Sequence, residues 1–92
     1  MPSDQVNASP ADLRKLASAL SAYQQQVKAA SKQVRGALDH ANWNDSRKAQ
    51  FESRYKDLDR RIDGFLSGEV AQMIKSLKEL ARKLDDIRST RL

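Results

Sequence analysis

The feature that most constrains this chain is an apolar side chain that recurs in alternating steps of three and four residues. Between residues 13 and 41 this repeat is unbroken. The spacing places the apolar groups on one narrow stripe of an α-helix, and four such heptads are typical of a coiled-coil seam. The stripe comprises Leu13, Leu16, Leu20, Tyr23, Val27, Ala30, Val34, Ala37 and Ala41. The sequence therefore predicts a first helix whose packing follows this seam.

Both ends of the first helix carry local signals. Ser9 supplies a capping hydroxyl, and Pro10 follows it at the first helical position, where its missing N–H costs nothing. The run Asn42–Ser46 interrupts the repeat with short polar side chains that favour caps and turns. We expect a first helix over about 10–41 and a turn over 42–46. Asn44, Asp45 or Ser46 is then the N-cap of a second helix.

The apolar repeat resumes after the turn and predicts a second helix over about 46–89. Three successive steps of four lie between Leu58 and Val70, so the heptad slips there. Gly64 and Gly68 flank the slip, and we expect a straightened or kinked segment at 64–69. The alternative is a third helix that begins near Glu69. The resumed stripe comprises Phe51, Tyr55, Leu58, Ile62, Leu66, Val70, Met73, Leu77, Leu80, Leu84 and Ile87.

The predicted fold is all-α: an antiparallel two-helix hairpin over 10–89, with flexible termini at 1–9 and 90–92. Residue-by-residue pairing outward from the turn lets the first helix reach only to about residue 75 of the second. Leu77–Ile87 then lack cover, and two helices alone give one layer of contact. We therefore expect two hairpins to form a four-helix bundle. Its predicted seam comprises Leu13, Leu16, Leu20, Tyr23, Val27, Val34, Phe51, Leu58, Ile62, Leu66, Val70, Met73, Leu77, Leu80, Leu84 and Ile87.

No pattern of residues indicates an enzyme, a cofactor or a small-molecule ligand. Cysteine is absent, and His40 is the only histidine. His40 lies near Asp39 and Asp45, but this set lacks a recognised metal-ligand spacing. We interpret His40 as a solvated or capping residue and predict no metal site. No apolar run is long enough for a membrane span, and the N-terminus lacks the pattern of an ordinary secretory signal.

The pattern Leu38-x4-Trp43-x-Asp45-x5-Phe51 resembles the WXG family of small helical proteins of type VII (ESX-like) secretion systems. The chain length, the long helix before Trp43 and the heptad-spaced second helix also match. The family's glycine is Asp45 here, in the WXG-like turn Trp43-Asn44-Asp45. The only match to the family's Tyr-x3-Asp/Glu export signal is Tyr55–Asp59, in mid-helix. We read Tyr55 as core, so that signal is absent or lies on a partner chain.

The resemblance implies a hairpin that dimerises and leaves the bacterial cytoplasm without a cleavable signal peptide, as a secreted substrate or as a co-secreted escort. A homodimer is slightly favoured over a heterodimer with a related hairpin, and the secretion machinery or a larger secreted substrate is a further partner. One alternative is a cytoplasmic adaptor or chaperone that receives a client helix along Leu77–Ile87. The other follows from the net charge of +5: nucleic-acid binding through a basic cluster. That cluster is Arg47, Lys48, Arg54, Arg60 and Arg61.

Overall fold

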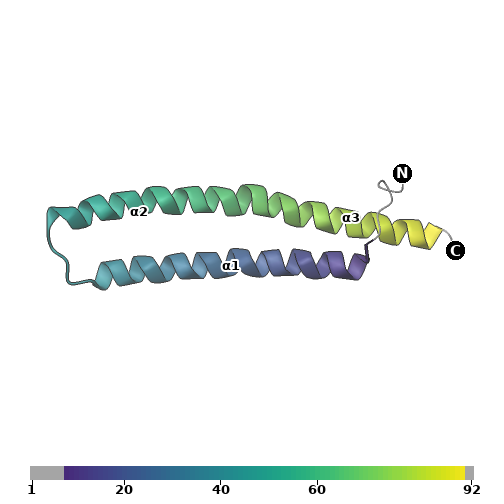
Figure 1. Ribbon diagram of the computed structural model, residues 1–92, viewed down its shortest axis with the longest axis horizontal. Helices are drawn as coiled ribbons and strands as arrows, with labels where there is room; N and C mark the ends of the chain where they lie inside the picture. Colours follow the sequence, from purple (N-terminus) through teal and green to yellow (C-terminus); the bar gives the residue numbers. More distant parts are fainter. Residues whose placement is uncertain (1–7, 91–92) are drawn as a thin grey trace.

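The computed structural model describes residues 8–90, and nearly all of them are helical (Figure 1). Helix α1 spans Pro10–His40, α2 spans Ser46–Phe65, a π-helical turn spans Leu66–Val70, and α3 spans Ala71–Thr90. The prediction of an all-α chain is confirmed for this part of the molecule. None of its helices is long and apolar enough to cross a membrane. The predicted flexible segments 1–9 and 90–92 lie mostly outside the described residues.

The helix ends follow the predicted capping chemistry. The Ser9 hydroxyl accepts a hydrogen bond from the Asp12 amide at 3.4 Å, and Pro10 occupies the first turn. Helix α1 ends at His40, one residue before the predicted boundary, because Ala41 adopts an extended backbone. Asp45 is the N-cap of α2, where its Oδ1 accepts from the Arg47 amide at 2.9 Å. Asp45 thus takes the role for which three residues were candidates.

Helix α2, the π-turn and α3 form one uninterrupted rod over 46–90 (Figure 1). The residues at both junctions, Phe65, Leu66 and Ala71, keep right-handed helical dihedral angles. The alternative of a separate third helix near Glu69 is therefore wrong. The predicted irregularity at 64–69 is instead a wider helical turn, in which the Ala71 amide donates to the Leu66 carbonyl.

Helix α1 lies alongside the rod and runs antiparallel to it, giving a body 69 × 23 × 16 Å (Figure 1). An ion pair joins Arg14 in the first turns of α1 to Asp85 near the end of α3. Midway along, the Gln24 side-chain amide donates to the Leu66 carbonyl at 2.7 Å. Contact is closest between α1 and α3, and the helices separate toward the turn.

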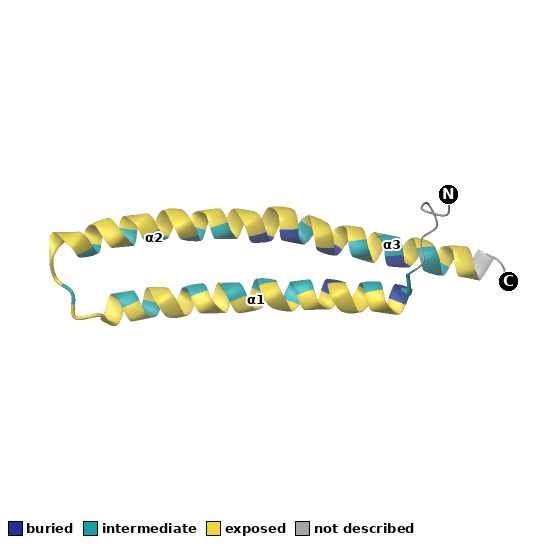
Figure 2. Cartoon of the chain, in the orientation of Figure 1, coloured by how far each residue is buried: buried dark blue, intermediate teal, exposed yellow. Residues whose placement is uncertain are grey.

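The buried core extends from the middle of the molecule toward the end opposite the turn. Ala17 of α1 packs with Leu66, Val70 and Ile74, and Ala81 is also fully buried (Figure 2). Within Ser46–Phe65 no residue is buried. Small Ala17 and Ala81 permit the close approach of α1 and α3, because close-packed helices need small side chains where their backbones are nearest. Half of the molecule therefore has a core of its own and half does not.

The predicted overhang at Leu77–Ile87 is corrected. Leu77 packs against the core, and Leu80 and Leu84 are half-buried; only Ile87, 53% exposed, is open. The prediction failed because it paired residues directly outward from the turn. In the structure, α2 begins beyond the end of α1 (Figure 1), so α1 reaches further along α3. Exposed apolar side chains instead run along both helices. They are Leu16, Tyr23 and Val34 of α1, Phe51, Leu58 and Phe65 of α2, and Met73 and Ile87 of α3.

Candidate helix-binding surface

The predicted seam of the rod consists of two separate stripes. An inner stripe faces α1 and is buried or half-buried throughout: Tyr55, Asp59, Ile62, Leu66, Val70, Ile74, Leu77, Ala81 and Leu84. An outer stripe runs beside it, and four of its six members directly precede a member of the inner stripe. It comprises Phe51, Leu58, Phe65, Met73, Leu80 and Ile87, of which all but Leu80 are between 42% and 54% exposed.

Helix α1 is divided in the same way. Its inner stripe is Pro10, Leu13, Ala17, Leu20, Gln24, Val27, Ser31, Val34 and Leu38, and each is buried or half-buried except Val34, which is 42% exposed. Its outer stripe has a seven-residue spacing and is exposed: Leu16, Tyr23, Ala30 and Ala37. Large side chains thus occupy the outer stripe at the start of α1, and small ones occupy it near the turn.

The two outer stripes lie on the same face of the molecule. Each is displaced by one residue, about 100° of helical rotation, toward the N-terminus from an inner position. Because α1 and the rod are antiparallel, the same displacement turns both stripes to one side of their contact plane. We call this combined surface the apolar face. It runs the length of the molecule beside the contact between α1 and the rod.

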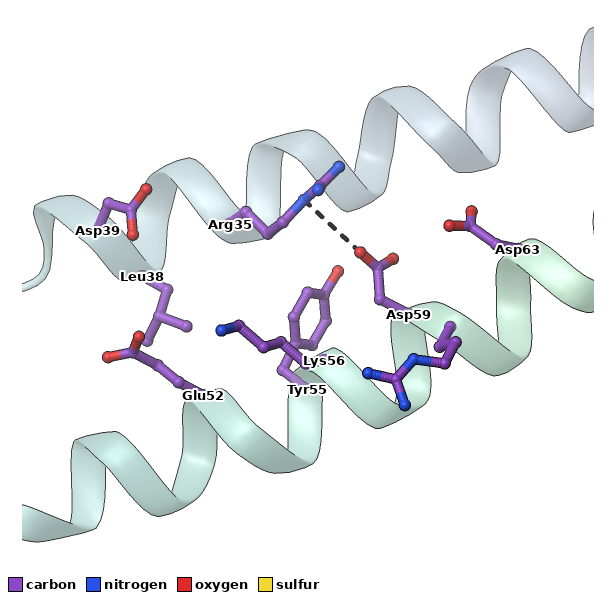
Figure 3. Close-up of a pocket in the computed structure, with 9 residues that line it drawn as sticks. Arg35, Leu38, Asp39, Glu52, Tyr55, Lys56, Asp59 and Asp63 are labelled. Carbon is purple, nitrogen blue, oxygen red and sulfur yellow. Dashed lines mark ion pairs between the residues drawn. The ribbon is translucent and has the colours of Figure 1, made fainter.

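The opposite face is polar and holds the charged contacts between α1 and α2. Arg35 Nε lies 3.6 Å from Asp59 Oδ2 (Figure 3), and the Ser31 hydroxyl donates to the same carboxylate. Beside them lies an open cleft of about 370 Å³, where Asp39 and Lys56 also line the wall. These polar contacts take the place of an apolar core near the turn.

Trp43 joins the turn to the apolar stripe of α2. Its ring lies 5.8 Å from that of Phe51, centroid to centroid, with the planes tilted by 49°. Its Nε1–H donates to Asp45 Oδ1 at 2.9 Å, the oxygen that also caps α2. Within residues 8–90 no residue has a positive φ, so the position that is glycine in the WXG pattern needs no left-handed backbone. Asp45 fixes the tryptophan and the helix start together, while Asn44 is exposed.

Tyr55 and Asp59, the pair spaced like an export signal, both turn toward α1. The Tyr55 hydroxyl lies 2.9 Å from the Ser31 hydroxyl, which also donates to Asp59. Both residues are half-buried. The structure therefore holds this pair between the helices and not on the open surface.

The sixteen predicted seam residues differ in exposure. Leu66 and Val70 are buried; Leu13, Leu20, Val27, Ile62, Leu77, Leu80 and Leu84 are half-buried. Leu16, Tyr23, Val34, Phe51, Leu58, Met73 and Ile87 are exposed. The sequence analysis missed Ala17, Ile74 and Ala81 in the core and Phe65 on the apolar face. Continuing the repeat with a step of four after Val70 would have found Ile74.

The sequence analysis predicted no metal site and interpreted His40 as a solvated or capping residue. His40 is exposed in the last turn of α1, where the helix dipole favours a positive charge. Within residues 8–90 no three His, Cys, Asp or Glu side chains are placed to hold a metal ion. The apolar face is therefore the feature of this fold with the clearest functional meaning.

Comparison with known proteins adds no relative: no family model, no curated protein and no solved structure matches this chain.

Proposed function

We propose that this chain is a small WXG-like protein of a type VII secretion system that acts by helix–helix association. In this proposal its hairpin pairs through the apolar face with a second hairpin, a copy of itself or a related chain, in a four-helix bundle. It leaves the cell as a substrate or as the escort of a larger secreted protein. No catalytic step is part of this role.

The observation that carries the proposal is the exposed outer stripe beside a helix without a core. Phe51, Leu58 and Phe65 of α2 are each 42–45% exposed, and no residue within Ser46–Phe65 is buried. Contiguous apolar surface on this scale marks an interaction site. In a four-helix bundle each seam points at the bundle centre, between the two neighbouring helices. The apolar residues of this chain are divided in that way: the inner stripe contacts the other helix of the hairpin, and the outer stripe is free to contact a second hairpin.

The tryptophan turn gives a second line of support. Trp43 is half-buried against Phe51 and hydrogen-bonded to Asp45, which makes the turn a defined structure at one end of the apolar face. Trp43 and Phe51 are two of the residues on which the resemblance to WXG proteins rests. The secretion role itself rests on that resemblance.

Export is tested by expressing the tagged chain in a bacterium with a type VII system and in a derivative whose secretion motor is disabled. The proposal predicts the chain in the medium of the first strain and in the cells of the second. A cytoplasmic reporter protein controls for lysis. Retention in the cells of both strains would contradict secretion and favour the alternative of a cytoplasmic adaptor, whose client helix would occupy the same apolar face.

A further inference from the structure

A row of arginines follows the edge of the apolar face along α2. Arg47, Arg54 and Arg61 are spaced by seven residues, and each lies three or four positions from a member of the outer stripe. Residues at this separation are neighbours on a helix surface. Arg54 and Arg61 line an open cleft of about 420 Å³ together with Phe51, Tyr55 and Leu58. The basic row and the exposed apolar side chains therefore form one surface.

The basic row has no acidic partner within residues 8–90. The ion pairs there join Arg14 to Asp85, Arg35 to Asp59 and Arg60 to Asp57. None of them involves Arg47, Arg54 or Arg61. Of the four carboxylates of α2, Asp57 lies within one helical turn of Arg54 and Arg61 but pairs with Arg60 in the structure. Asp59 points toward α1, and Glu52 and Asp63 line the polar clefts. Three guanidinium groups at one edge of an apolar stripe thus remain available to an occupant of that stripe.

A second copy of the chain offers these arginines no acidic row. The opposite edge of the apolar face, three positions after or four before the outer stripe of α1, carries Asp12, Ala19, Gln26, Gln33 and His40. Apart from single carboxylates at Asp12 and at Glu69 on the rod, packing the face of one copy on that of another sets the arginines against side chains without a carboxylate or against the arginines of the second copy. Like charges so placed weaken association, and rows of opposite charge select a partner.

We propose that the apolar face receives an unlike chain: an amphipathic helix with carboxylates at seven-residue spacing beside its apolar stripe. This inference rests on the proposed helix-binding function and names the chemistry of the partner. The outer stripe of α1 contributes only Ala30 and Ala37 near the turn, whereas α2 contributes Phe51, Leu58 and Phe65. A bulky ridge beside a shallow trough fits a rod-shaped partner better than a flat lipid surface.

The test uses synthetic helical peptides of about four heptads, a length at which an isolated helix becomes stable. One peptide carries Glu in the row beside its leucine stripe, one carries Gln there and one Lys. Each is titrated with the chain, and binding is followed by fluorescence anisotropy. We expect the Glu peptide to bind about 10-fold more tightly than the Lys peptide, with a difference that shrinks as salt is raised.

Charge reversal on the chain provides the matched test. The double variant Arg54→Glu/Arg61→Glu is expected to reverse the order, so that the Lys peptide binds best. Lys75→Glu/Arg82→Glu makes the same change in charge away from the outer stripe and is expected to keep the order of the parent chain. All four positions are exposed, and circular dichroism checks that each variant stays helical.

Three results would overturn the inference, and they separate it from the proposed function. If all peptides bind alike and charge reversal changes nothing, the face binds helices without charge selection. If a tight dimer of the chain excludes the Glu peptide, the occupant is a second copy. If the chain ignores all peptides and binds phosphatidylserine vesicles, the face is a membrane surface. Of these results, only the last also contradicts the helix-binding function. That function is contradicted as well if the chain stays monomeric and binds neither the peptides nor a second copy.

Discussion

At the scale of single residues, Asp45 connects the two features of the turn. One oxygen of its carboxylate accepts from both the Trp43 indole and the Arg47 amide, each at 2.9 Å. The capping role was predictable, because Asp directly before a helical pattern is a strong N-cap signal. The bond to Trp43 was not, since local propensity says nothing about where an indole N–H points.

Replacing Asp45 with Ala should therefore destabilise the fold. We expect a loss of about 1 kcal/mol in the free energy of unfolding, the usual cost of removing an N-cap. Asp45→Asn is the matched control, because an amide oxygen in the same place can accept both hydrogen bonds. Urea unfolding followed by circular dichroism measures the difference, and Trp43 fluorescence should change in the Ala variant alone. Equal stabilities of all three chains would contradict the capping role.

Gln24 is the second residue with an identifiable task. Its amide donates to the Leu66 carbonyl at the start of the π-turn, at 2.7 Å. Gln24→Glu keeps the shape but removes the donor and turns a carboxylate toward a carbonyl oxygen. We expect it to cost about 1–2 kcal/mol, more than Gln24→Ala, which only removes the hydrogen bond. Thermal unfolding at neutral pH compares them; a Glu variant as stable as the parent would contradict this account.

At the scale of elements, the π-turn explains the heptad slip. The inner stripe advances by steps of four and three except for one extra residue between Leu66 and Ile74. The outer stripe shows the same excess, with eight residues between Phe65 and Met73 and seven elsewhere. A π-turn takes one more residue than an α-turn. It therefore keeps both stripes in phase along the whole rod.

Deletion of Gly68 should accordingly be tolerated. Removing one residue within the π-turn restores an unbroken heptad, so α1 and the rod can pack as before along an α-helical path. We expect an unfolding free energy within about 1 kcal/mol of the parent, since one helical glycine is also lost. Deletion of Ala22 is the control, because α1 is a continuous α-helix without a π-turn that could take up the change. It rotates one part of α1 against the other by about 100° and should cost several kcal/mol, because Ala17 and Leu20 can no longer face the rod together with Val27.

The close packing of α1 and α3 gives a further element-scale prediction. Ala17 and Ala81 are both completely buried, so Ala81→Leu must force the helices apart and should cost about 1–3 kcal/mol. Ala29→Leu adds the same atoms at an exposed position of α1 and should leave the melting temperature almost unchanged. Similar melting temperatures for the two variants would contradict the packing described between α1 and α3.

The elements show where sequence reasoning succeeded and where it stopped. Helix boundaries followed from Ser9, Pro10 and Asp45, and the slip near Gly64 and Gly68 was visible in the spacing. The form of the slip was not, because one extra residue can be absorbed by a kink, a break or a π-turn. The sequence analysis placed Met73 in the seam, whereas the structure buries Ile74 and exposes Met73. This error has the same origin. It depends on which turn takes up the added residue.

At the scale of the whole molecule, the two halves differ in what covers them. The half built from α1 and α3 buries Ala17, Val70, Ile74 and Ala81. In the half next to the turn, α1 and α2 meet through Ser31, Asp59 and other polar side chains, and α2 exposes its apolar stripe. The sequence predicted uncovered apolar residues only over Leu77–Ile87, whereas in the structure they extend along the whole rod and along α1. The register of an antiparallel pair depends on the path of the turn, which the heptad pattern does not specify.

This asymmetry leads to the central claim that another helical chain completes the molecule along the apolar face. The most direct test is light scattering, which gives the mass in solution of the chain alone and with the Glu peptide. Leu58→Glu/Phe65→Glu removes two apolar side chains from the face and leaves the core of α1 and α3 intact. We predict that the parent chain gains the mass of a second helical chain in at least one of the two samples, from a second copy or from the Glu peptide. The double variant should remain helical and should stay a single chain in both samples. A parent that remains a single helical chain in both samples would contradict the claim.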